Sequence, residues 1–338
     1  MMSRITVLGT GSWGTILGNM LSENGHEVHL WGNNPKVIDE INNIHTNEHY
    51  LKKFHINPTL KADHDLKIAL NGSDAVLFVV PTNAIRVVAE QIKPYLDQAE
   101  NKPILIHAAK GIELKTKLRI SQVIESILPV AEYGEVVVIS GPSHAEDVAR
   151  KDLTALTVAS RDISHAQTVQ QIFKNNYFRL YTNDDVVGVE VGAALKNVIA
   201  IGAGIVHGLG YGDNTKAALM TRGLAEITRL GVKLGADPLT FSGLSGVGDL
   251  IVTCTSSNSR NWRAGNDLGR GKKLDDILEN IGQVVEGVTT AKSVHFEAQE
   301  LGVSVPITDT IYEILYENKD LKQGIIDLMN RDSKPEFI

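Results

Sequence analysis

Short apolar runs alternate with longer amphipathic segments through the first half of the chain. This alternation is typical of β-α-β units built around a parallel sheet. Residues 76–80, Val-Leu-Phe-Val-Val, are apolar throughout, which predicts a strand covered on both faces, as in the middle of a doubly wound sheet. The pattern predicts six strands, at residues 5–8, 27–31, 75–80, 104–108, 136–140 and 155–159.

After about residue 185 the strand pattern fades and helical spacing takes over. Within residues 186–206, Gly192, Lys196 and Ala200 recur every four positions, so they share one face of a predicted helix that is rich in small side chains. Further helices are predicted at residues 215–234, 274–281, 290–300 and 306–317.

The length of 338 residues is typical of two domains, at about 150 residues for each domain. The change of pattern places the boundary between them near residues 185–190. We expect an α/β domain with a doubly wound, mostly parallel sheet over residues 1–188, followed by an all-α domain over residues 189–338.

Composition narrows the possible partners. There are 40 acidic and 33 basic residues, for a net charge of -7, so no global basic field predicts nucleic-acid binding. Cys254 is the only cysteine, which excludes an intrachain disulfide and a cysteine-cluster metal site, and no metal is expected. The chain start does not resemble a secretory signal, and every apolar run is shorter than the roughly 18 residues of a membrane helix. We expect a cytoplasmic protein without stable membrane insertion.

The clearest motif is a glycine-rich loop that directly follows the first predicted strand. Residues 9–14, Gly-Thr-Gly-Ser-Trp-Gly, match G-x-G-x-x-G and precede a predicted helix. In a dinucleotide-binding Rossmann fold, Gly9 would form the tight turn, Gly11 would let the backbone approach the pyrophosphate, and Gly14 would let helix and strand pack closely. The alternative is a simple glycine-rich turn, but the strand before the motif and the second strand after it favour a cofactor site.

The residues after the second predicted strand do not decide whether the cofactor is NAD or NADP. A carboxylate at the end of the second strand binds the ribose hydroxyl of NAD, and an arginine there accommodates the 2′-phosphate of NADP. This chain has Asn33 in that region, which is neither acidic nor basic.

Two lysines have surroundings that favour a functional role. Lys110 follows the predicted strand at residues 104–108, which places it at the carboxyl end of the sheet, where open α/β sheets bind ligands. Lys196 lies on the small-residue face of the helix at residues 186–206. A lysine on a helix is usually a solvated charge, but the apolar neighbours of Lys196 argue against a fully solvated position.

Two polar turns add further candidates. In the segment after residue 246, Asp249 could orient an ammonium group, and Arg260, flanked by Ser259 and Asn261, could bind a phosphate with two parallel hydrogen bonds. The alternative is a polar turn in which the asparagine caps the next helix, and spacing alone does not decide between the two. A second turn, at residues 140–145, leaves a predicted strand at the same edge of the sheet and supplies backbone donors.

The histidines are predicted to be structural or surface residues. His107, His144 and His207 show neither metal-ligand spacing nor an obvious carboxylate partner in the sequence.

Together these blocks resemble the bacterial-type NAD(P)-dependent sn-glycerol-3-phosphate dehydrogenases, over nearly the whole chain. The resemblance rests on seven ordered blocks: residues 9–14, Ala109-Lys110-Gly111, Ser140-Gly141-Pro142-Ser143, Ala194-Leu195-Lys196-Asn197-Val198, Gly246-Val247-Gly248-Asp249-Leu250, Ser259-Arg260-Asn261 and Val284-Val285-Glu286-Gly287. Position 33 departs from the family, because many relatives carry a basic residue near it.

The resemblance implies a role for each matching residue. Lys196 stands where the family has its general acid/base. Substrate contacts are implied for Lys110, Gly141, Ser143, Lys196, Asp249, Ser259, Arg260 and Asn261. Cofactor contacts are implied for Gly9, Gly11, Ser12, Trp13, Gly14, Asn33, Lys110, Ala145, Arg260, Val284 and Glu286. The family also implies a homodimer and a role in supplying glycerol 3-phosphate for phospholipid synthesis.

The expected reaction is hydride transfer between NAD(P)H and a small phosphorylated substrate, dihydroxyacetone phosphate. Reduction builds negative charge on the C2 oxygen, which a lysine ammonium can stabilise and protonate. Two alternatives stay open. One is another two-domain NAD(P)-dependent dehydrogenase, of the 3-hydroxy acid or ketopantoate type. The other is a dinucleotide sensor that binds the cofactor without turnover.

Overall fold

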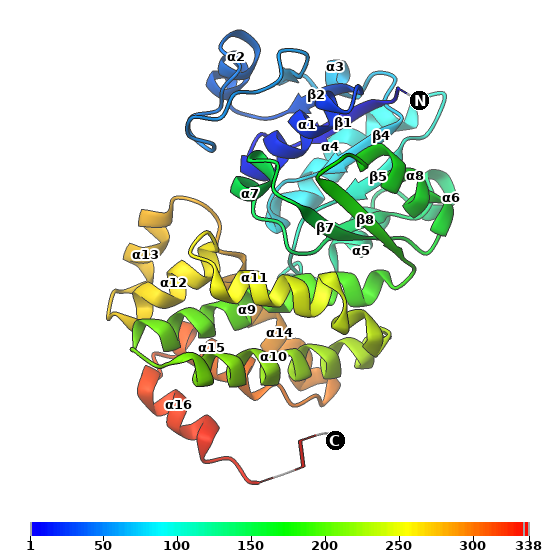
Figure 1. The fold of residues 1–338 in the computed structure, drawn as a ribbon. Helices are drawn as coiled ribbons and strands as arrows, with labels where there is room; N and C mark the ends of the chain where they lie inside the picture. Colours follow the sequence, from blue (N-terminus) through cyan, green and yellow to red (C-terminus); the bar gives the residue numbers. More distant parts are fainter. Residues whose placement is uncertain (1, 334, 337–338) are drawn as a thin grey trace.

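The computed structural model describes residues 2–333 and 335–336, which form an α/β part followed by a helical part (Figure 1). One sheet runs in the order β3-β2-β1-β4-β5-β6-β7-β8. All neighbouring strands are parallel except β6 and β7, so β7 and β8 run opposite to the first six strands. The strands are β1 (Arg4–Leu8), β2 (Glu27–Trp31), β3 (Lys61–Asp63), β4 (Ala75–Phe78), β5 (Ile104–His107), β6 (Val137–Ser140), β7 (Thr154–Ala159) and β8 (Phe178–Asn183).

Six of these strands match the predicted ones within two residues, and the expected fold class is confirmed. The sequence did not predict β3 and β8, which lie at the two edges of the sheet. Strand β3 has only three residues, and β8 carries exposed polar positions such as Arg179 and Thr182. Edge strands of this kind lack the continuous apolar run that identifies a central strand.

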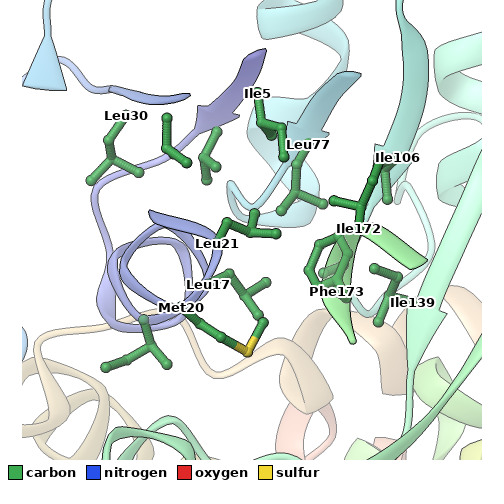
Figure 2. Close-up of a cluster of buried hydrophobic side chains, with 14 of the residues drawn as sticks. Ile5, Leu17, Met20, Leu21, Leu30, Leu77, Ile106, Ile139, Ile172 and Phe173 are labelled. Atoms are coloured by element: carbon green, nitrogen blue, oxygen red, sulfur yellow. The ribbon is translucent and has the colours of Figure 1, made fainter. Parts of the chain in front are cut away.

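Helices cover both faces of the sheet and bury it. Ile5 of β1, Leu77 of β4 and Ile106 of β5 face one layer, where they meet Leu17 of α1 and Phe173 of α8 (Figure 2). Leu8, Val76 and Phe78 point to the opposite layer. The helices of this part are α1 (Ser12–Glu23), α2 (Pro35–Asn43), α3 (Leu66–Leu70), α4 (Ile85–Asp97), α5 (Ile120–Glu125), α6 (Val130–Tyr133), α7 (Ala145–Ala149) and α8 (Ile163–Phe173).

The helical part is organised around α9 (Val186–Gly208), which is packed against α10, α11, α12 and α14. The other helices are α10 (Asp213–Lys233), α11 (Asp249–Thr255), α12 (Arg260–Gly269), α13 (Leu274–Ile281), α14 (Glu286–Leu301), α15 (Pro306–Tyr316) and α16 (Leu321–Met329). All five helices predicted for this half are present. The domain boundary at residue 188 stays a prediction.

Helix α9 is long and apolar enough to cross a membrane by length and composition, but its most apolar stretch is entirely buried by the rest of the fold. Glycines on α9 and on the helices packed against it allow this burial. A Cβ on Gly265 of α12 would lie 1.9 Å from the carbonyl oxygen of Ile201 on α9, so only glycine permits the two helices to approach this closely. Helix α9 is therefore the core helix of the helical part.

Candidate active site

The candidate site starts where the parallel strands end. The strand order reverses between β1 and β4, which is the point at which open α/β sheets bind their ligands. The loops after β1, β5 and β6 lead from this edge of the sheet and carry Gly9, Lys110 and Gly141 respectively.

The glycine loop after β1 has the backbone that a dinucleotide requires. Gly9 has φ +129°, a conformation that favours glycine. A Cβ on Gly14 would lie 2.0 Å from the carbonyl oxygen of Gly9, whereas a Cβ on Gly11 would meet nothing within 4 Å. Gly11 is also the N-cap of α1 and supplies no side chain to cap it. The first turn of α1 is therefore left open to an anion, and this loop fits the pyrophosphate of NAD(P).

The other residues implied for the adenosine side lie around this loop. The amide of Gly9 donates to the carbonyl of Trp31 at the end of β2, at 2.8 Å. Asn33 follows two residues later and is exposed. The hydroxyl of Ser12 donates to the carbonyl of Tyr50 at 3.0 Å, and Trp13 packs half-buried against the core.

Asp249 brings the two candidate lysines together. Its Oδ2 accepts from Nζ of Lys110 at 2.8 Å, and its Oδ1 accepts from Nζ of Lys196 at 2.5 Å. Lys110 also donates to the carbonyl of Gly141 at 3.1 Å, and Lys196 donates to the hydroxyl of Thr253 at 2.7 Å. The predicted role of Asp249 in orienting an ammonium is consistent with these contacts, which join the two parts of the chain.

Burial makes this cluster electrostatically unusual. Lys196 is only 5% exposed, and burial lowers its pKa to about 7, against the pull of Asp249. The charge of Lys110 lowers the pKa of Lys196 further. Burial alone would raise the pKa of Asp249, but Lys110 and Lys196 together hold it below its usual value. The result is a buried amine that can gain or lose a proton near neutral pH beside a permanently charged carboxylate.

Two other titratable groups face Lys196. Burial lowers the pKa of His144, and the charge of Lys196 lowers it further. Nε2 of His144 lies 3.4 Å from the carbonyl oxygen of Val252, in keeping with a structural role for the ring. Burial raises the pKa of the Cys254 thiol to about 12, so it is not an available nucleophile.

A second cluster adjoins the lysines through two asparagines. Asn261 is buried and donates to Oδ1 of Asn197, the neighbour of Lys196, at 2.9 Å. It also accepts from the amide of Gly287 at 2.9 Å. The residue that caps α12 is Ser259, whose hydroxyl accepts from the amide of Trp262. The alternative in which an asparagine caps this helix is therefore wrong.

Arg260 stands at the first turn of α12, next to Asn261. It donates to Oε1 of Gln283 at 3.2 Å. Burial lowers the pKa of Arg260, and nearby Glu286 opposes this shift. Lys110, Asp249 and Lys196 thus meet directly, and Arg260 is linked to them through Asn261 and Asn197.

The remaining predicted residues lie in the turn after β6, at the start of α7, and just before or at the start of α14. Glu286, at the start of α14, accepts from the amide of Thr82 in the loop after β4 at 3.2 Å. The hydroxyl of Ser143 donates to the carbonyl of Gly141 at 3.0 Å, and Ala145 begins α7. Val284 is exposed just before α14.

Sequence reasoning missed several polar residues here. Nε2 of His107 lies 3.1 Å from Oε1 of buried Glu190, a carboxylate neighbour that the sequence did not reveal. The two residues are 83 positions apart in the chain, and no local pattern connects them. Thr253 was given no role from the sequence, although it follows Asp249 by one helical turn.

Comparison with known proteins now decides the family. The family model described as NAD-dependent glycerol-3-phosphate dehydrogenase N-terminus matches residues 4–166, and the corresponding C-terminus model matches residues 185–326. The chain belongs to the NAD-dependent glycerol-3-phosphate dehydrogenase family. The resemblance, the enzyme class and the NAD(P) cofactor predicted from the sequence are confirmed at this level.

Relatives agree over the full length. A protein of Lacticaseibacillus paracasei named glycerol-3-phosphate dehydrogenase (NAD(P)+) is 62% identical, and the match covers 100% of this chain and 97% of the relative. A glycerol-3-phosphate dehydrogenase from Coxiella burnetii, solved at 2.1 Å, is 37% identical with a TM-score of 0.91 and covers 98% of this chain and 99% of its own.

The solved structures also include a protein of the alternative type, a ketopantoate reductase. The crystal structure of a putative ketopantoate reductase from Ralstonia solanacearum has a TM-score of 0.56 at 14% identity and covers 97% of this chain and 99% of its own, so it shares the fold alone.

Within residues 2–333 and 335–336, no group of three or more His, Cys, Asp or Glu side chains could hold a metal ion.

The geometry of the glycine loop yields a first test. In Gly14→Ala the new methyl group would collide with the backbone of Gly9, so the loop must shift and NADH affinity should fall about tenfold or more. Gly18→Ala is the matched control on α1, because its methyl group would meet a flexible Leu60 side chain at 3.4 Å. Fluorescence titration with NADH measures the affinities. Wild-type affinity in Gly14→Ala would contradict the assignment of this loop.

Proposed function

We propose that this protein interconverts dihydroxyacetone phosphate and sn-glycerol 3-phosphate with NAD(P)H, and that Lys196 is the general acid/base. One observation carries the assignment of the catalytic residue. Lys196 is a buried amine whose pKa lies at about 7. It donates to one oxygen of the Asp249 carboxylate, and Lys110, in the loop after β5, donates to the other. A proton carrier with a pKa near the working pH is what a reversible carbonyl reduction needs.

The cofactor is assigned to the glycine loop and its surroundings. Gly9, Gly11 and Gly14 would hold the pyrophosphate, and Ser12 and Trp13 would contact it from the first turn of α1. Asn33 would face the adenosine ribose. The contacts implied nearer the nicotinamide come from Lys110, Ala145, Arg260, Val284 and Glu286. When bound, NAD(P)H supplies the hydride in one direction and NAD(P)+ accepts it in the other.

The residues of the lysine cluster would manage charge at the C2 oxygen of the substrate. In the reduction, the ammonium of Lys196 stabilises the negative charge that builds on this oxygen and then donates its proton to it. In the oxidation, neutral Lys196 takes the proton from the C2 hydroxyl. Asp249 holds both lysines in place, and Lys110 adds a second positive charge at the same position.

The pH dependence follows from the pKa of Lys196. Because burial lowers this pKa to about 7, the amine is mostly neutral above pH 7 and mostly charged below it. The kcat of glycerol 3-phosphate oxidation should therefore rise with pH through about 7, whereas reduction should be favoured on the acid side.

The substrate phosphate is assigned to Arg260, with Asn261 and Ser259 beside it, and the resemblance adds Gly141 and Ser143 on the turn after β6. A guanidinium binds a phosphate with two parallel hydrogen bonds. Asn261 donates to Asn197, the chain neighbour of Lys196, at 2.9 Å, and this contact supports the proposal that one substrate reaches both Arg260 and Lys196.

The wider role is inferred from the family resemblance. We place the enzyme in the cytoplasm, as a homodimer that supplies glycerol 3-phosphate for phospholipid synthesis. The charge of -7 and the single cysteine are compatible with this location.

Removing the amine of Lys196 tests the assignment of the catalytic residue. In Lys196→Met the kcat for dihydroxyacetone phosphate should fall about a hundredfold to ten-thousandfold, the range for loss of a general acid. Lys233→Met is the control, because Lys233 is an exposed lysine at the end of α10 and should leave kcat unchanged. NADH oxidation followed at 340 nm measures both. Near-wild-type turnover in folded Lys196→Met would overturn the mechanism.

Arg260→Lys tests the phosphate site. At saturating cofactor, kcat/KM for dihydroxyacetone phosphate should fall about tenfold or more, because a lysine cannot form the paired hydrogen bonds of a guanidinium. Turnover of dihydroxyacetone, which lacks the phosphate, should change little. The control is Arg263→Lys, at an exposed arginine on the same helix. An equal loss with both substrates would show that Arg260 does not read the phosphate.

A further inference from the structure

A buried ionic cluster lies beneath the lysines, at the contact between α9 and the sheet. It consists of Glu190 on α9, His107 at the end of β5, and Arg119 and Ser121 at the start of α5. All four side chains are at least nine-tenths buried, and the proposed reaction uses none of them.

Every polar contact of Glu190 comes from the α/β part. Its Oε1 accepts from the amide of Ser121 at 2.7 Å and lies 3.1 Å from Nε2 of His107. Its Oε2 accepts from the hydroxyl of Ser121 at 2.6 Å and from the guanidinium of Arg119. Burial alone would raise the pKa of Glu190, but His107 first, and then Arg119 and Ser121, hold it at about 2. Glu190 is therefore a buried carboxylate whose two oxygens both accept hydrogen bonds from Arg119 and Ser121 at the start of α5.

These contacts hold both ends of the loop that carries Lys110. That loop, residues 108–118, begins directly after His107 and ends directly before Arg119. Ile112 and Arg119 form an antiparallel bridge across its base, and the amide of Glu113 donates to the carbonyl of Leu118 at 3.0 Å. Ile112 is buried in the core of the helical part.

Glu190 also shares a rigid element with Lys196. The two residues are six positions apart on α9, about 9 Å along the axis. Because Glu190 is held in place, it fixes how α9 is rotated about its axis and how far α9 extends along that axis. The position of Lys196 on the same helix follows from this. The same carboxylate thus determines where Lys110 and Lys196 lie relative to Asp249.

We propose that Glu190 is a positioning residue that sets the geometry of Lys110 and Lys196 around Asp249, by holding the base of the Lys110 loop against α9. This inference rests on the proposed function of Lys196. Loss of the Glu190 charge would leave Arg119 buried without its partner and would release the base of the loop. Lys110 would then move away from Asp249.

The displacement has a definite electrostatic sign. The charge of Lys110 lowers the pKa of Lys196, so withdrawing Lys110 raises it. The pH limb of glycerol 3-phosphate oxidation, which reports neutral Lys196, would then move to higher pH. Glu125 is the other carboxylate near Glu190. Burial raises the pKa of Glu125, Arg161 opposes the shift, and Glu135 and Glu190 add to it, so loss of the Glu190 charge would also lower the pKa of Glu125.

The test is the pH profile of kcat for glycerol 3-phosphate oxidation in Glu190→Gln. We expect kcat to fall about tenfold or more, and the limb near pH 7 to shift upward by about half a unit or more, as in Lys110→Met. Glu226→Gln is the matched control. Glu226 is a buried carboxylate that accepts from the amides of Ile307 and Thr308 in the helical part, so its loss should lower the Tm and leave the limb in place.

A second variant decides the matter if Glu190→Gln does not fold. Ser121→Ala removes one donor to Glu190 and should shift the limb in the same direction by a smaller amount. An unmoved limb in folded Glu190→Gln, or in Ser121→Ala where only that variant folds, would overturn the positioning role. The absence of any turnover in the wild-type protein would instead overturn the proposed function.

Discussion

The site depends on one buried carboxylate that is shared by two lysines. Asp249 is almost fully buried, and taking its charge out of water is costly unless it is paired. Lys110 and Lys196 provide that pairing from opposite sides, one from the loop after β5 and the other from α9. The same desolvation that requires the pairing also lowers the pKa of Lys196 to about 7, which makes the amine a proton carrier.

The fold makes this arrangement possible through close packing. Helix α9 reaches the end of the sheet because small residues allow α12 and the segment before α11 to lie against it. A Cβ on Gly192 would lie 2.7 Å from the carbonyl oxygen of Ser245, just before Asp249. The glycines of the helical part thus act like those of the loop after β1. Both let backbone segments approach closely beside a charged group, which is Asp249 in the helical part and the proposed pyrophosphate at the loop.

The sequence predicted the central strands and the main helices, and it singled out Lys110, Lys196 and Asp249 as candidates, because those features depend on local pattern or on blocks of matching residues. It missed the edge strands β3 and β8, whose polar positions hide the strand pattern. It also missed the contact of His107 with Glu190, which exists only because β5 and α9 meet in the fold. Pairings between distant buried groups carry no local signature, so they become visible only in three dimensions.

The most direct test of this account is the pKa of Lys196 itself. Competitive labelling with acetic anhydride over a range of pH, read by mass spectrometry, reports the fraction of neutral amine at each lysine. The wild-type protein should give a midpoint at about 7 for Lys196, and Asp249→Asn should give a lower one, because the carboxylate raises this pKa. A midpoint near 10.5, the ordinary value for lysine, would contradict the account.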